Sequence, residues 1–270
     1  MNNVNRFRDQ IAAGHICTGT AVTLNDPAVS ELLAEAGYDF TWIDTEHAPF
    51  DLQGTLGHIM ACRGTNTAPF VRVRENDANL IKPVLDLCPA GIIVPNVNSP
   101  EAARAAVQAC KYPPHGIRGY GPRRGIRYGA QSMSDYLGVA DRQTLVILQI
   151  EHIDAVNQID AILAVPGIDS ICIGPNDLSG SMGKLGKTTD PELVRAIELV
   201  ATRTRRAGVT LGVSTGYNAE TLPIWIDRGV QWINLNVDWV NLFLYSKSVV
   251  DAVRQVKRTP AINESTRSKS

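Results

Sequence analysis

Short apolar runs rich in β-branched residues alternate along the chain with longer stretches in which apolar residues recur at helical spacing. The short runs predict eight strands, at 17–22, 40–44, 69–73, 91–94, 145–150, 170–173, 210–213 and 232–235. Strands that alternate with helices favour a parallel sheet, and eight such repeats favour its closure into a (β/α)₈ (TIM) barrel.

Helix boundary signals support the same alternation. Asn25-Asp26-Pro27 is predicted to open a helix that Gly37 ends, and Ser99 to cap a helix that has Pro100 at its first position. Asp190-Pro191 is predicted to open a helix through Arg206. A doubly wound open sheet is the rival fold, but the first strand runs into residues 22–27 without its usual glycine-rich phosphate turn.

Two connections are longer than the others and predict binding segments or lids, since long loops in compact domains are often functional. They span 111–141, which is dense in Gly, Pro and Arg, and 174–189. We expect a single barrel domain over 1–258, followed by a polar, disordered tail at 259–270.

Composition narrows the class of partner. The 270 residues carry 26 Lys and Arg against 27 Asp and Glu, with no basic stripe, which argues against nucleic acid and anionic membranes. The polar start of the chain does not fit a signal peptide, and no apolar run is long enough to span a bilayer. The five cysteines are scattered without a Cys-x-x-Cys pair, which indicates reduced thiols in a cytoplasmic enzyme that acts on small molecules.

Ionisable residues gather at the predicted ends of several strands, where barrel enzymes place their active sites. Strand two ends in Asp44 and is followed by His47, strand three carries Arg72, strand five runs into Glu151 and strand six into Asp177. Two acids suit a divalent ion that keeps positions open for substrate oxygens. An imidazole can move protons near neutral pH, and a guanidinium can stabilise a developing enolate.

Each of these residues also has a purely structural interpretation. Strand-end carboxylates can form an ion-pair network, Arg72 can pair with one of them, and His47 can be a hydrogen-bonded loop residue. His152 follows Glu151 directly and is expected to turn towards packing, because strand neighbours point to opposite faces.

Several motifs occur in order along the chain. They are Tyr38-Asp39-Phe40, Asp44-Thr45-Glu46-His47, Val71-Arg72-Val73, Gly91-Ile92-Ile93-Val94-Pro95, 112–119, Gln149-Ile150-Glu151 and Gly174-Pro175-Asn176-Asp177-Leu178-Ser179. Together they resemble the HpcH/HpaI family of class II pyruvate aldolases, and the likeness covers residues 5 to 255.

The resemblance implies a role for each residue that matches a motif. Glu151 and Asp177 would hold Mg²⁺, Mn²⁺ or Co²⁺, which binds pyruvate, with Gln149 lining the metal site. Backbone amides around Asn176 and Asp177 would take the carboxylate, and Arg72 would stabilise the enolate oxygen.

Proton transfer and assembly are implied in the same way. His47, oriented by Asp44, would move a proton to or from the aldehyde oxygen, and Asp86 would approach the histidine of a neighbouring subunit. The family resemblance also implies a hexamer built as a trimer of dimers, with the final helix exchanged between subunits, and a role in the breakdown of aromatic compounds or sugar acids.

The chain departs from the family pattern near strand four, at Asn96 and at Cys88-Pro89-Ala90. Outside the motifs, Ser214 at the end of strand seven is a further candidate substrate contact. The arginines at 118, 123, 124 and 127 form a basic loop. We interpret most of them as solvated residues that pair across a subunit interface, and assign only Arg123 to the substrate.

The leading hypothesis is a reversible cleavage of a 4-hydroxy-2-oxo acid into pyruvate, or a related 2-oxo acid, and an aldehyde. The motifs place no lysine at a strand end, which argues against a Schiff-base mechanism. Two further hypotheses stay open: an oxaloacetate decarboxylase or acyl-CoA lyase that uses the same site, and a barrel that binds a 2-oxo acid without turnover.

Overall fold

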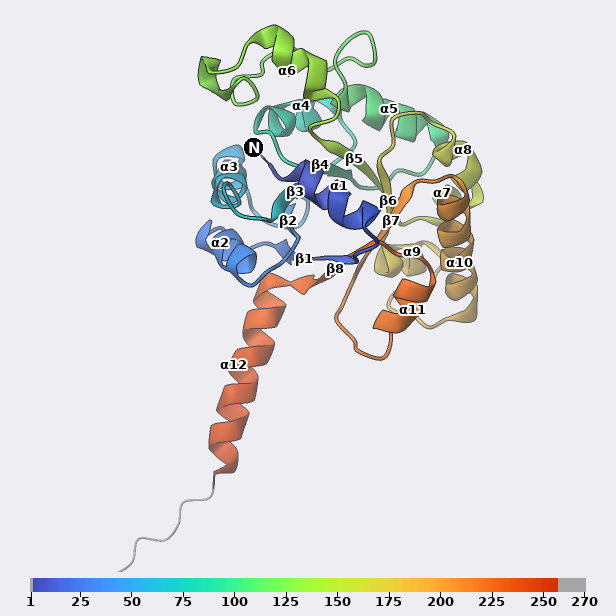
Figure 1. Cartoon of the computed structure of the whole chain (residues 1–270). Coiled ribbons are helices and arrows are strands. Elements are labelled where there is room, and N and C mark those ends of the chain that lie inside the picture. The colour runs from blue at the N-terminus through green and yellow to red at the C-terminus, as the bar shows by residue number, and fades with distance from the viewer. Residues whose placement is uncertain (1, 257–270) are drawn as a thin grey trace, which may run out of the picture. The chain divides into compact units, whose positions relative to one another are not determined.

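A closed barrel of eight parallel strands forms the centre of the protein, in a computed structural model that describes residues 2–256 (Figure 1). The predicted fold is therefore confirmed. The strands are β1 Cys17–Val22, β2 Phe40–Asp44, β3 Ala68–Arg72, β4 Gly91–Val94, β5 Leu145–Ile150, β6 Ser170–Ile173, β7 Thr210–Thr215 and β8 Trp232–Val237. Five of the eight have the predicted bounds, β3 lies one residue earlier, and β7 and β8 each run two residues further.

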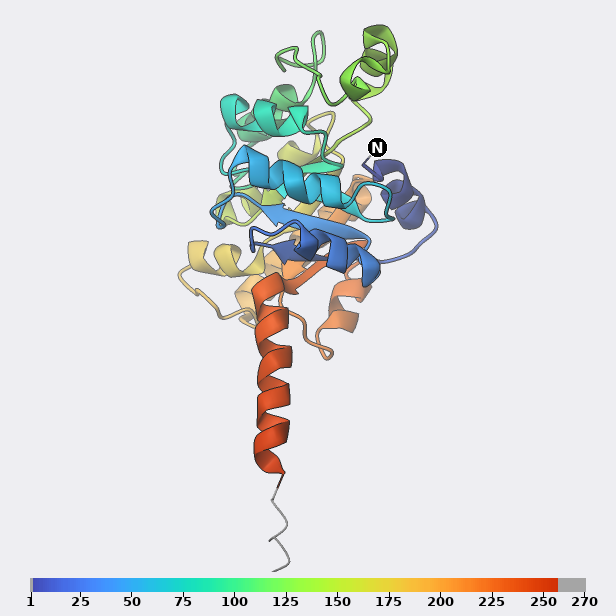
Figure 2. The same cartoon turned by 90° about the vertical axis from the view of Figure 1, so that its left-hand side faces the viewer.

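The helices α1 to α11 surround the strands, as two views at right angles show (Figures 1 and 2), and α12 belongs, from Trp239 on, to a separate unit. Those before the long loop are α1 Val4–Ala12, α2 Ala28–Glu35, α3 Leu52–Ala61, α4 Ala78–Asp86 and α5 Pro100–Cys110. The later ones are α6 Met133–Ala140, α7 Ile153–Asn157, α8 Ile159–Leu163, α9 Pro175–Ser181, α10 Pro191–Arg206, α11 Leu222–Asp227 and α12 Asp238–Gln255.

The predicted helix starts have physical causes. Ser99 caps α5 by accepting from the N–H of Ala102, and Pro100 occupies the first turn. Asp190 caps α10 in the same way, accepting from the N–H of Glu192. Gly37 follows α2 with φ 92°, a left-handed conformation that glycine adopts without a steric cost.

Aromatic side chains fill the barrel interior. The stacked rings of Phe40 and Phe70 lie 5.0 Å apart, and Trp232 meets Phe40 edge-on at 5.4 Å. A glycine on the neighbouring strand β7 makes room for the Trp232 ring, because a Cβ atom added at Gly212, the register partner of Trp232, would lie 1.9 Å from that ring. Phe7 of α1 packs edge-on against Phe70 and so helps to close the N-terminal end of the barrel.

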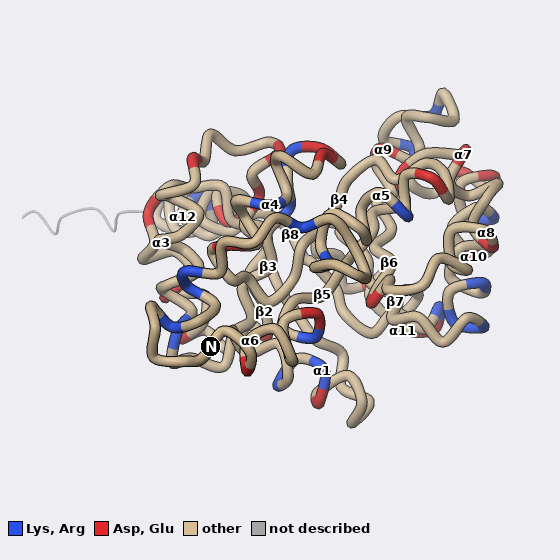
Figure 3. The backbone as a smooth tube through the Cα atoms, turned by 90° about the horizontal axis from the view of Figure 1, so that it is seen from above, with Lys and Arg blue, Asp and Glu red and all other residues tan. Residues whose placement is uncertain are grey.

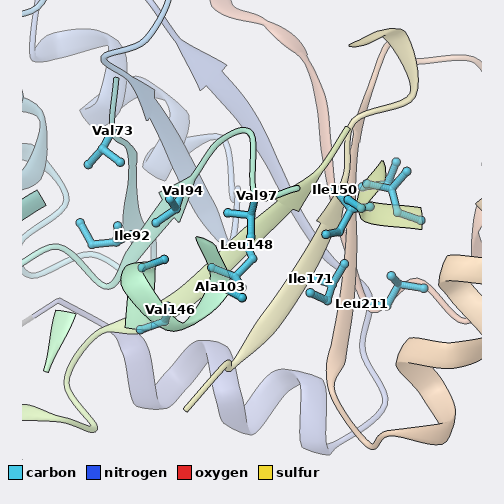
Figure 4. Packing of buried hydrophobic residues seen from close by; sticks show 14 of the residues in the cluster. Val73, Ile92, Val94, Val97, Ala103, Val146, Leu148, Ile150, Ile171 and Leu211 are labelled. Carbon is cyan, nitrogen blue, oxygen red and sulfur yellow. The ribbon is translucent and has the colours of Figure 1, made fainter. Parts of the chain in front are cut away.

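A second core lies between the strands and the surrounding helices. It is built by the alternate residues of the strands, such as Ile92, Val94, Val146 and Leu148, all with no exposed surface (Figure 4). The barrel is therefore packed on both faces of its sheet, which leaves only the strand ends open for chemistry.

The long connection at 111–141 is more ordered than expected. It contains α6 and a short 3₁₀ turn, and Tyr112 and Tyr136 form a small core within it. The interpretation of its arginines as solvated was wrong for two of them. Arg118 packs 4.4 Å above the Tyr112 ring and Arg124 donates to the carbonyl of Leu87, and both are buried. The second long connection contains α9.

Contacts divide the chain into a barrel unit, Met1–Asp238, and a second unit that begins at Trp239 and whose described part belongs to α12. The predicted domain limits of 1–258 stay a prediction, and the predicted tail at 259–270 lies outside the described residues. Within residues 2–256, none of the helices combines the length and the apolar character that a membrane crossing requires. Acidic and basic positions are interspersed in the view of Figure 3.

Candidate active site

The strand register brings the predicted site residues into the barrel mouth. Side chains of a strand alternate between its two faces, so residues two positions after an interior aromatic also point inwards. Asp44 stands two positions after Trp42, and Arg72 two positions after Phe70, whose rings are both buried in the barrel core. Asp44 and Arg72 are direct partners in the register of β2 and β3. Gln149 follows Ile147 in the same way on β5.

Arg72 is the centre of a buried ion cluster. Its Nε and Nη2 donate to the two carboxylate oxygens of Asp44, at 3.0 and 2.6 Å. Its Nη1 lies 2.8 Å from Oε2 of Glu46, and the guanidinium stacks 5.2 Å from the centre of the Trp42 ring. These contacts fix the planar cation in one orientation, with only 9% of the residue exposed.

His47 lies beyond this cluster on the loop after β2, with 67% of its side chain exposed. Its backbone N–H donates to Oδ1 of Asp44 at 3.4 Å, while its ring nitrogen Nε2 lies 3.8 Å from Oε2 of Glu46. Asp44 thus contacts the main chain of His47, and Glu46 is the acid beside its ring. A surface imidazole of this kind can exchange protons with solvent.

Glu151 follows β5 directly and is 4% exposed. Its Oε2 accepts from Nε2 of Gln149 at 2.6 Å, and its Oε1 accepts from the backbone N–H of Asn96 at 2.7 Å. Burial raises the pKa of the Glu151 carboxyl to about 7; the hydrogen bond from Asn96 opposes this rise, and the charges of Asp177 and Glu46 add to it. Three carboxylates therefore act on one another at this side of the barrel mouth.

Asp177 and Asn176 lie in the first turn of α9, after Gly174, and both are exposed. The space between strand end and helix is narrow, because a Cβ atom at Gly174 would lie 3.0 Å from Oε2 of Glu151. A glycine at this position lets the helix start close to the Glu151 carboxylate.

The residues present fit a hard divalent cation. Glu151 and Asp177 are oxygen donors with mutually unfavourable charges, and Oε1 of Gln149 is buried without a hydrogen-bond partner. Such a group suits an ion that keeps some water ligands, one of which can donate to Gln149. Residues 2–256 contain no cluster of three or more His, Cys, Asp or Glu side chains suited to holding a metal, so any ion here would use few protein ligands.

The remaining predicted residues are spread around this centre. Asp86 is the last residue of α4 and accepts from Nη2 of Arg118 at 2.9 Å. Arg123 is exposed on the loop at 111–141. Ser214 lies near the end of β7, where its hydroxyl oxygen accepts from Nδ2 of Asn234 on β8 at 2.9 Å.

Two contributors to the site were not assigned a role from the sequence. Glu46 contacts Arg72 and the His47 ring, which its place between Asp44 and His47 could have signalled. Asn96 adopts φ 55°, a left-handed conformation that asparagine tolerates better than most residues, and so directs its N–H at Glu151. Asn96, where the chain departs from the family pattern, thus lies beside Glu151, the proposed metal ligand.

The expectation for His152 was wrong. It does not pack into a core but caps α7, with Nδ1 accepting from the N–H of Asp154, and 39% of its side chain is exposed. The strand ends at Ile150, so strand alternation no longer applies two residues later.

Several known proteins are similar to this chain in sequence. A hydroxypyruvate/pyruvate aldolase from Pseudomonas aeruginosa is 39% identical over 210 residues, which cover 78% of each protein. A 5-keto-4-deoxy-D-glucarate aldolase from Escherichia coli is 34% identical over 82% of this chain and 87% of its own length. Aldolases are carbon–carbon lyases, so the predicted class of enzyme is confirmed. Neither a decarboxylase, nor an acyl-CoA lyase, nor a barrel without turnover is favoured by these similarities.

A solved structure and a family model agree with these sequence similarities. The crystal structure of an HpcH/HpaI aldolase from Desulfitobacterium hafniense superposes with a TM-score of 0.87 at 29% identity, covering 93% of this chain and 97% of that one. The model of one family, described as HpcH/HpaI aldolase/citrate lyase, matches residues 18–238, which include all of the barrel strands except the first residue of β1. This chain belongs to the HpcH/HpaI aldolase/citrate lyase family.

Proposed function

We propose that this protein is a divalent-metal-dependent aldolase that reversibly cleaves a 4-hydroxy-2-oxo acid into pyruvate, or a related 2-oxo acid such as hydroxypyruvate, and an aldehyde. The observation that carries the proposal is the buried Glu151 carboxylate, which lies within electrostatic reach of Asp177, Glu46 and Arg72 at the barrel mouth. Similarity to relatives named for pyruvate and hydroxypyruvate supports the substrate class.

Glu151 and Asp177 would hold Mg²⁺, Mn²⁺ or Co²⁺ there, with Gln149 bonded to Glu151 from inside the barrel. Such an ion, when bound, polarises a 2-oxo group and stabilises negative charge on its oxygen. Backbone amides of Asn176 and Asp177 in the first turn of α9 would take the substrate carboxylate.

In the cleavage direction His47 accepts the proton of the C4 hydroxyl, and the C3–C4 bond breaks with its electrons moving towards the 2-oxo oxygen. Arg72 stabilises the charge that develops on this oxygen. Of the five N–H groups of its guanidinium, three meet Asp44 and Glu46, so two stay available for the enolate. Asp44 orients Arg72 through their ion pair, and it positions His47 by accepting a hydrogen bond from the backbone N–H of His47.

We also propose the hexamer of three dimers with an exchanged final helix, in which Asp86 approaches the histidine of a neighbouring subunit. Taken by itself, α12 supports this, because several of its large apolar side chains, among them Leu242, Phe243 and Val253, are more than half exposed and require cover from another surface. A cytoplasmic location is proposed as well, and the five free, buried cysteines are consistent with it.

The proposal is tested by measuring pyruvate release from a small panel of 4-hydroxy-2-oxo acids, coupled to lactate dehydrogenase, with chelator and then with added Mn²⁺ or Mg²⁺. We expect release only with metal, and its collapse in Glu151→Gln and His47→Ala. Borohydride with pyruvate should not trap the protein, since no Schiff base forms. Full activity in chelator would overturn the metal assignment, and no release from any substrate would overturn the aldolase.

A further inference from the structure

Two side-chain carbonyl oxygens inside the barrel have no hydrogen-bond partner, Oε1 of Gln149 and Oδ1 of Asn234. Both residues are almost fully buried, with 2% and 3% of their surface exposed. Leaving a buried acceptor unpaired costs about 1–3 kcal/mol, so each is expected to meet a donor in the working enzyme. A water held at the proposed metal site would supply a donor for Oε1 of Gln149, but no group of that site would supply one for Oδ1 of Asn234.

Asn234 lies at the catalytic end of the barrel. It stands two positions after Trp232, whose ring is part of the interior core, so its side chain points into the same interior one layer nearer the mouth. Trp232 lies 6.3 Å from Trp42, and the guanidinium of Arg72 stacks on Trp42. Asn234 and Arg72 therefore both point into the barrel mouth, Asn234 from β8 and Arg72 from β3.

The chemistry of the Asn234 amide follows from its one bond. Nδ2 donates to the hydroxyl oxygen of Ser214, its register partner on β7, at 2.9 Å. The Ser214 hydroxyl proton has no acceptor among residues 2–256, and Oδ1 of Asn234 has no donor there. The pair thus presents an unpaired acceptor, Oδ1 of Asn234, beside the Ser214 O–H and the second Nδ2 proton of Asn234 as donors. A single hydroxyl group can pair with the acceptor and with one of these donors at once. A carboxylate supplies no donor, and a methyl group supplies neither.

We propose that Ser214 and Asn234 form a subsite for a hydroxyl group of the substrate, and that the enzyme prefers hydroxylated substrates because of it. The inference rests on the proposed aldolase function. The hydroxyl has two possible sources, C3 of the 2-oxo acid, as in hydroxypyruvate, or the carbon next to the aldehyde, as in glycolaldehyde. An analogue without this hydroxyl leaves a buried acceptor unpaired and is disfavoured.

The test measures kcat/KM in the condensation direction for pyruvate and hydroxypyruvate, each with acetaldehyde and with glycolaldehyde, in the presence of Mn²⁺. Wild type should favour the hydroxylated member of one pair at least tenfold, which corresponds to about 1.4 kcal/mol. Asn234→Ala and Ser214→Ala should each remove most of this preference. If the variants lose the preference between the two 2-oxo acids, the hydroxyl comes from the 2-oxo acid. If they lose the preference between the two aldehydes, it comes from the aldehyde.

Asn76→Ala is the matched control, because Asn76 also donates from its side-chain amide, to the carbonyl of Ala102, but lies on the loop before α4. It should lower stability without changing the preference. A wild type that converts all substrates without preference overturns the subsite, even if neither variant folds. The subsite is also overturned if Asn234→Ala and Ser214→Ala both fold and both keep the preference. In that case the two residues would have only a structural role, or would bind a buried water, and their loss would slow all substrates alike. No conversion of any substrate by wild type would instead overturn the proposed aldolase itself.

Discussion

Arg72 donates to both carboxylate oxygens of Asp44, and the two residues are also direct register partners on neighbouring strands. The bidentate pair is therefore set by the sheet itself, not by a mobile loop. Because both side chains are nearly buried, each charge depends on the other for its solvation. The pair fixes the orientation of the Arg72 guanidinium, which in the proposed mechanism faces the enolate, and Asp44 supplies the opposite charge that a buried cation requires.

Replacing Asp44 by Asn should therefore affect stability as well as activity. The substitution leaves the buried Arg72 with Glu46 as its remaining acidic partner, and we expect a loss of about 3 kcal/mol in the free energy of unfolding. Urea unfolding at pH 7.5 measures this value. Asp169→Asn is the control, since the Asp169–Arg8 pair is partly exposed and should contribute less than about 1 kcal/mol. Equal losses in the two variants would contradict the role of burial.

His47→Ala should separate catalysis from stability. The ring is largely exposed, so its removal should change the free energy of unfolding by less than about 0.5 kcal/mol. The loss of a proton-transfer group should lower kcat for cleavage by about 10²–10⁴-fold. His115→Ala removes another exposed histidine, paired with Asp141, and should leave kcat unchanged. A His47→Ala enzyme with wild-type kcat would exclude this residue from proton transfer.

Thermal unfolding tests the metal site without substrate. An ion that binds only the folded state stabilises it by about 2.7 kcal/mol at a hundredfold excess over its Kd. We expect Mn²⁺ to raise the Tm of the chelator-treated wild type and to have little effect on Glu151→Gln, which keeps the shape of the side chain but loses the ligand charge. Glu101→Gln, an exposed acid on α5, should retain the full response. The same rise in both variants would place the ion elsewhere.

The buried thiols predict a loss of stability in alkali. Burial raises the pKa of Cys17 to about 12, of Cys62 to about 11 and of Cys110 to about 12. In the unfolded chain these thiols ionise near pH 9, so their contribution is complete below that value. It is lost as the pH rises towards 11–12, by up to about 1.4 kcal/mol per pH unit for each thiol. Unfolding free energies between pH 8 and 11 should show this slope, and Cys17→Ala should reduce it.

Much of the fold was predictable because the barrel repeats one simple pattern. Buried strands such as Val146–Leu148 have continuous apolar runs, and caps such as Ser99 and Asp190 mark the helices. The ordered part of the loop at 111–141 was missed for a different reason. Tyr112, Arg118 and Tyr136 form their core only when brought together in space, and the Gly and Pro between them resemble an unstructured loop.

Within the candidate site, the sequence identified charged residues at strand ends but not their partners. Asp44 and Glu151 could be placed at the mouth because they stand at the carboxyl ends of predicted strands, where barrel enzymes hold their active sites. The contacts of Glu46 with Arg72 and of Asn96 with Glu151 depend on loop conformation after the strands, which has no period in the sequence. The left-handed conformation of Asn96 is an example, since no repeating pattern of the sequence predicts it.

The packing of the interior aromatics gives a final prediction. A Cβ atom at Gly212 would lie 1.9 Å from the Trp232 ring, and both residues are buried, so Gly212→Ala should cost at least about 2 kcal/mol. Gly138, exposed within α6, has no heavy atom within 4 Å of its added Cβ, and Gly138→Ala should stabilise the protein by up to about 1 kcal/mol through helix propensity. Chemical denaturation of both variants measures the difference. Because Trp232 lies one interior layer below Asn234, Gly212→Ala should also disturb the barrel mouth and lower kcat/KM, whereas Gly138→Ala should leave kcat/KM unchanged. Equal stability of the two variants would contradict the close approach of β7 to the Trp232 ring.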